Sequence, residues 1–175
     1  KEVGYMDEIV NKDKINDITI QLAMAMAASD NHLDQKELNV IKNWAKGITS
    51  LLDVDEAKER NKHFSTFIKK TYLETKQKKI SLSKLVKNFN EVAGKSQKYT
   101  AIELLLEVAQ ADGNLGKEED SFINKIAKTT GIDLSTFKEM RNKIIANVDT
   151  IDLADNNTEQ NFGLTDEMTN IEKCK

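Results

Sequence analysis

Six acidic side chains in two short segments have the composition of a divalent-cation site. They are Asp30, Asp34, Glu37, Asp112, Glu118 and Glu119. Their ligand atoms would be carboxylate oxygens, which suit Ca²⁺ or Mg²⁺ rather than a thiophilic metal. Neither segment has the EF-hand pattern, which needs Asx residues at alternating positions and a glutamate at the end of the loop. The residue types therefore indicate a Ca²⁺ or Mg²⁺ site, provided that the fold brings the two segments to one face.

The same acids can also be explained as loop and cap structure. The segments 34–37 (Asp-Gln-Lys-Glu) and 116–119 (Gly-Lys-Glu-Glu) fit a capping box and a weaker counterpart of it. Asp30 and Asp112 fall where an apolar helix is expected to end, and there the helix dipole disfavours a carboxylate by about 0.3–1 kcal/mol. Each carboxylate can instead turn forward and accept hydrogen bonds from loop N–H groups. Both interpretations stay open on the sequence alone.

The helical segments that are expected to position these acids occur twice in the chain. Residues 20–37 recur as residues 102–119 at a constant offset of 82 residues, which places Asp30 on Asp112. Each copy predicts an apolar helix, a tight loop holding one leucine, and a second helix with a glutamate in its first turn. A repeat at a fixed offset indicates a repeated structural unit. A duplicated helix pair commonly packs about a pseudo-two-fold axis, which would bring both acidic loops to one face.

Residues 28–37 and 111–119 resemble the paired A-D-G-x-x-x-x-E-E signatures of the tellurite-resistance TerB family. That family also includes the N-terminal domain of a membrane-anchored DnaJ-like co-chaperone. The resemblance extends over about residues 15–148 in helix order and spacing. The first copy has Asn31 where glycine is usual. The resemblance implies a non-catalytic acidic binding or scaffold module in a stress response, with a protein partner such as a TerC-like membrane protein or a chaperone.

Composition predicts an all-α fold, a compact bundle of about seven helices with an internal two-fold repeat. The 175 residues suit one domain, contain no proline and only 7 glycines, and lack the strict alternation of strands. A short leading helix is expected in residues 1–14. The longer expected helices cover residues 15–28, 34–47, 53–79, 81–94, 96–111, 117–131 and 133–145.

Several classes of function are disfavoured by the sequence. A net charge of −3 without a basic stripe gives little support for nucleic-acid binding. No apolar stretch approaches the roughly 18 residues of a membrane span, so this chain is not expected to insert into a bilayer. Cys174 is the only cysteine, which favours a reducing, cytoplasmic location. No Ser-His-Asp or Cys-His arrangement and no glycine-rich phosphate loop is present, so we expect no enzymatic activity.

The domain boundaries follow from a change in composition near the end of the chain. Residues 1–148 are expected to form the TerB-like helical domain, and residues 149–163 a polar linker. Residues 164–175 look like the start of a further helical segment, with Leu164, Met168 and Ile171 on one side. In some members of the family a DnaJ-related segment follows the helical unit. The alternative function is therefore a regulatory domain of a DnaJ-like co-chaperone.

Overall fold

The computed structural model describes residues 5–29, 33–111, 113, 115–144 and 146, with side chains described from residue 12 onward. A seventh helix, over residues 134–144, follows six others, and no strand occurs in the described residues. The six are α1 (Tyr5–Ala27), α2 (Gln35–Thr49), α3 (Val54–Lys76), α4 (Leu82–Val92), α5 (Lys95–Ala109) and α6 (Lys117–Thr129). The predicted all-α bundle of about seven helices is confirmed. None of the described helices is long and apolar enough to cross a bilayer.

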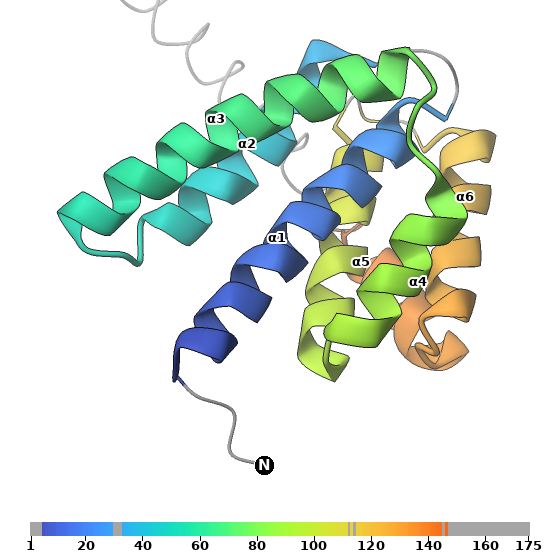
Figure 1. The fold of residues 1–175 in the computed structure, drawn as a ribbon. Coiled ribbons are helices and arrows are strands. Elements are labelled where there is room, and N and C mark those ends of the chain that lie inside the picture. Colours follow the sequence, from blue (N-terminus) through green and yellow to red (C-terminus); the bar gives the residue numbers. More distant parts are fainter. Residues whose placement is uncertain (1–4, 30–32, 112, 114, 145, 147–175) are drawn as a thin grey trace, which may run out of the picture.

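Helix α1 is the centre of the bundle and packs against each of α2 to α6 (Figure 1). Its apolar residues do not keep to one face, because Leu22, Ala23, Met24 and Met26 are all fully buried. A helix that is apolar on all sides needs neighbours on all sides. The expected break between a leading helix and residue 15 is wrong: α1 is continuous from Tyr5, and no glycine or proline within it would end a turn.

Helices α2 and α3 form an antiparallel hairpin (Figure 1). As expected, Asp53 caps α3, with its Oδ1 accepting a hydrogen bond from the Glu56 N–H at 2.9 Å. The predicted stop at Gly47 is wrong, because α2 runs through it to Thr49. A glycine inside a helix costs about 1 kcal/mol relative to alanine, which weakens a helix without breaking it.

Helices α4 and α5 are separated by only two residues. The buried face of α4, which includes Phe89, belongs to the core that α1 also forms. Gly94 was expected to close α4 and Ser96 to open α5, but Gly94 is the N-cap of α5 and its N–H donates to Gln97 Oε1. Gly94 therefore belongs to the start of α5 and not to the end of α4.

The seventh helix is anchored by Phe137, which is buried in the core. Arg141 forms an ion pair with Asp120 of α6 at 3.1 Å. Leu134 and Leu73 of α3 follow the apolar spacing of their helices, but each side chain is 56% exposed. The expected core residue Ile145 lies outside the described residues.

Candidate functional site

The two acidic segments follow helices that end at the same offset. Helices α1 and α5 end at Ala27 and Ala109, and α2 and α6 begin at Gln35 and Lys117, each pair 82 residues apart. Helices α1 and α5 pack against each other. Figure 1 shows both ending at the upper end of the bundle as drawn, where α2 and α6 begin. The fold therefore directs the connections after both apolar helices to one end of the molecule.

The structure describes four of the six candidate residues. Asp30 and Asp112 lie outside the described residues. Glu118 is exposed in the first turn of α6. Glu37 and Glu119 are only 3% and 4% exposed, which the sequence did not indicate. Glutamate is rarely buried to this degree, so these equivalent residues form part of the interior rather than of an open loop.

The two copies cap their second helices in different ways. In the first copy Asp34 Oδ1 accepts a hydrogen bond from the Lys36 N–H at 3.4 Å. In the second copy Glu119 Oε2 accepts one from the Gly116 N–H at 3.3 Å, and Gly116 has no side chain to make the other half. These contacts support the cap interpretation for two of the six acids, and both are long for hydrogen bonds.

The four described acids do not form a metal site by themselves. In the part of the chain that the structure describes, no three His, Cys, Asp or Glu side chains are grouped so that they could hold a metal ion. A site built from the six candidates would therefore need Asp30, Asp112 or both. The loop leucines, Leu33 and Leu115, both pack against the core and hold the flanks of the two connections in place.

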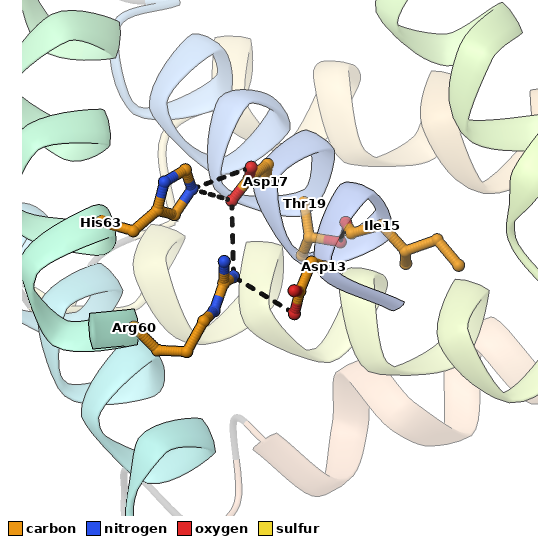
Figure 2. A network of polar contacts seen from close by, with 6 residues as sticks. All are labelled: Asp13, Ile15, Asp17, Thr19, Arg60 and His63. Carbon is orange, nitrogen blue, oxygen red and sulfur yellow. Dashed lines mark hydrogen bonds and ion pairs between the residues drawn. The ribbon is translucent and has the colours of Figure 1, made fainter. Parts of the chain in front are cut away.

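A polar network between α1 and α3 was not predicted from the sequence (Figure 2). His63 Nε2 lies 3.0 and 2.9 Å from the two carboxylate oxygens of Asp17 and donates to them. Arg60 lies 3.4 Å from Asp13 and 3.9 Å from Asp17. The His63 ring stacks on Phe67 with ring centroids 5.5 Å apart. The side chains that meet are more than forty residues apart, so no local pattern could have found the network.

The His63–Asp17 pair has the form of a base held by a carboxylate, which catalytic triads share. Such a pair needs a nucleophile within hydrogen-bond reach. In the described part of the chain no serine, threonine or cysteine is hydrogen-bonded to His63. The network links α3 of the α2–α3 hairpin to α1.

Glu103 and Glu107 stand one helical turn apart on the exposed side of α5. With Thr136, Met140 and Lys143 they line a hollow of about 360 Å³ between α5 and the seventh helix. Desolvation in this hollow raises the pKa of Glu107, and the charge of Glu103 raises it further. The pair is thus a slightly unfavourable feature of a solvated surface.

The family of the chain follows from a comparison with known protein families. A family model described as tellurite resistance protein TerB matches residues 52–142. The match runs from the α2–α3 turn into the seventh helix and includes the second acidic segment but not the first. No curated protein and no solved structure matches the chain. Since the family match covers more than half of the 175 residues, the chain belongs to the TerB family.

Proposed function

We propose that this chain is a non-catalytic binding module that joins a protein assembly in a stress response, and that its two acidic loops bind Ca²⁺ or Mg²⁺. The observation that carries the cation proposal is the matched placement of Glu37 and Glu119. Both are buried in the first turn of the helix that follows an acidic connection. Both connections leave the same end of the bundle (Figure 1).

In this proposal the six candidate carboxylates come together at one end of the bundle. Like charges a few ångströms apart repel, and the repulsion grows where burial lowers the effective dielectric constant. A hard cation with oxygen ligands offsets that repulsion. The long capping hydrogen bond of Asp34 engages its Oδ1, and the carboxylate has further lone pairs that can face a ligand.

The proposed role as a binding module is supported by the family and by the surface. The described hollows combine apolar floors with lysine and asparagine rims. Such surfaces suit a protein partner. The partner that the proposal favours is a TerC-like membrane protein or a chaperone, met in the cytoplasm.

The test is the melting temperature of the full chain in a Ca²⁺ and Mg²⁺ titration. At 1 mM cation and a dissociation constant of about 0.1 mM, binding to the folded state adds about 1.4 kcal/mol. For a domain of this size that raises the melting temperature by about 3–6 °C. Asp112→Asn should abolish the rise while costing little without metal, because the amide keeps an acceptor for loop N–H groups.

The matched control is Asp55→Asn, which removes an exposed carboxylate from the first turn of α3, outside both acidic segments. That variant should keep the full response to cation. A melting temperature that stays flat in the wild-type titration would leave the acids as loop and cap structure. Equal losses in both variants would show that the response reflects overall charge and not a site.

A further inference from the structure

A groove runs along the α2–α3 hairpin. Two hollows of about 370 and 610 Å³ share Lys42, Ile68 and Lys69, and together they form one continuous depression between the two helices. Leu38 and Tyr72 line one part, and Phe64 lines the other. The floor is thus apolar over several helical turns, which is the form of a groove that accepts an amphipathic helix.

The rim of this groove is basic on both sides. Lys42 and Lys46 line it from α2, and Lys69 lines it from α3. Among the described residues that line the groove, Asp34 is the single acid, and it is engaged in capping α2. The hollow of about 530 Å³ between α4 and α6 differs, because Glu91 accompanies its lysines. The α2–α3 groove therefore selects an occupant with acidic residues on both flanks.

The hairpin also carries three of the large apolar side chains that are exposed among the described residues. Leu51 and Val54, at the turn between the two helices, are 87% and 84% exposed, and Leu73 lines one end of the groove. Of the large apolar side chains that are exposed in the described part of the chain, only Leu134 lies elsewhere. Leu73 therefore extends the apolar lining at one end of the groove.

We propose that the occupant is the C-terminal segment of the same chain, residues 164–175, bound as a helix in the α2–α3 groove. Residues 149–175 contain seven acidic residues and two lysines, a net charge of −5. The whole chain carries −3, so residues 1–148 carry +2. The chain thus separates an acidic end from a weakly basic body, and the two attract each other.

If residues 164–175 form a helix, their apolar and acidic side chains are arranged to match the groove. At about 100° per residue, Met168 and Ile171 lie within about 40° of Leu164 and form one apolar stripe. On the same helix Glu167 lies about 60° to one side of Leu164, and Glu172 about 80° to the other. The stripe fits the apolar floor, and the flanking glutamates fit the lysines of the two walls. Three apolar anchors at i, i+4 and i+7 are the usual pattern of a helix bound in a groove.

The connecting chain is long enough for this contact. The 17 residues 147–163 reach about 55 Å when extended. A domain of this size has a radius of gyration of about 15 Å, so the connection can reach any point of its surface. Tethering at this length gives an effective concentration near the millimolar range, so a weak contact suffices. A partner that uses the groove would have to displace the segment, and this inference is independent of the cation proposal.

The native Cys174 allows a direct test in the full chain, because it is the only cysteine and lies inside the proposed segment. A nitroxide spin label on Cys174 should attenuate the NMR amide signals of groove residues such as Lys42 and Ile68. The amides of Val86 and Ile126, in the α4–α6 hollow, should keep their intensity. Attenuation at the α4–α6 hollow instead, or at neither surface, would overturn the proposal.

Variants separate a specific contact from general charge attraction. Lys42→Glu with Lys69→Glu should remove the attenuation at the groove, and Met168→Ser with Ile171→Ser should do the same from the side of the segment. The matched control, Lys87→Glu with Lys125→Glu, changes the charge of the other hollow by the same amount and should leave the attenuation intact. Attenuation that survives both groove and segment variants would refute the proposed contact.

A mixed sample distinguishes the same chain from a second copy. Spin-labelled protein without isotope enrichment is mixed with enriched protein that carries no label. Signals of the enriched copy should keep their intensity if the segment binds its own groove. Attenuation in the mixed sample would show that the occupant comes from another molecule and would overturn the intramolecular contact.

Discussion

Removing the Asp17 carboxylate should loosen the α2–α3 hairpin from α1. Asp17 accepts hydrogen bonds from His63 through both oxygens and lies 3.9 Å from Arg60, so Asp17→Ala breaks the centre of the network in Figure 2. Among the described residues, Asp13 has only the 3.4 Å contact with Arg60. The two aspartates lie one helical turn apart on α1, which makes Asp13→Ala a matched control.

The expected loss in free energy of unfolding depends on how far water reaches each pair. Hydrogen bonds to charged groups contribute about 1.5–3 kcal/mol when shielded, and exposed ion pairs about 0.2–1 kcal/mol. The side chains of Asp17 and His63 are 23% and 40% exposed, which is between these limits. We therefore expect Asp17→Ala to lower the free energy of unfolding by about 1 kcal/mol, or about 2–4 °C in melting temperature. Asp13→Ala should cost about 0.3 kcal/mol.

A double-mutant cycle measures the contact itself. Urea unfolding of Asp17→Ala, His63→Ala and the double variant should give a coupling energy of about 1 kcal/mol. The cycle of Asp17 with Arg60 should give less, because that pair is separated by 3.9 Å. Arg60→Ala also loses the stacking of the guanidinium over Phe64, at 4.6 Å from the ring centroid, but the cycle cancels this term.

Two results would refute this reasoning. A coupling energy near zero between Asp17 and His63 would mean that the contact is no better than hydration of the separate groups. Equal effects of Asp17→Ala and Asp13→Ala would mean that the stability of the hairpin depends on the net charge of α1 and not on the geometry of the network.

Three further predictions concern the core, the surface and a helix cap. Phe89→Ala empties a fully buried site and should lower the free energy of unfolding by about 3–5 kcal/mol in urea titrations. Glu107→Gln should raise stability at neutral pH by a few tenths of a kcal/mol, because it removes repulsion from Glu103 and the burial of a charge. Since the pKa of Glu107 is raised in the folded state, its unfavourable contribution is present above that pKa, and the gain should vanish in melting curves as the pH falls below the ordinary value of 4.5. Asp53→Ala should cost about 1 kcal/mol and Asp53→Asn much less, because the amide oxygen still caps the Glu56 N–H.

Much of the fold could be predicted because helices leave recognisable patterns in short stretches of sequence. The cap at Asp53 and the buried face of α4 are local patterns of three to eleven residues, and the structure agrees with both. Helix ends at glycine were harder, because the same residue is compatible with an interior position, as at Gly47, or an N-cap, as at Gly94. Leu73 follows the helical period of α3 but is 56% exposed, because the period does not show which residues a neighbouring helix covers.

The candidate site could be predicted in residue type but not in environment. The constant offset indicated that Glu37 and Glu119 are equivalent, and both indeed lie in a first helical turn at the same end of the bundle. Their burial depends on the helices packed around them, which is a tertiary relation that no segment encodes alone. The link from Asp17 to His63 was missed for the same reason.

The central position of α1 has a consequence for the synthesis of the chain. Helix α1 is made before every helix that covers it, and its partner α5 ends 82 residues after α1 does. At about 5–20 residues per second, the ribosome needs about 4–16 s to complete that stretch. During this time the side chains of Met24 and Met26, fully buried in the finished bundle, have no complete core to enter. The nascent chain therefore presents an apolar segment to the folding machinery of the cell until its second half has emerged.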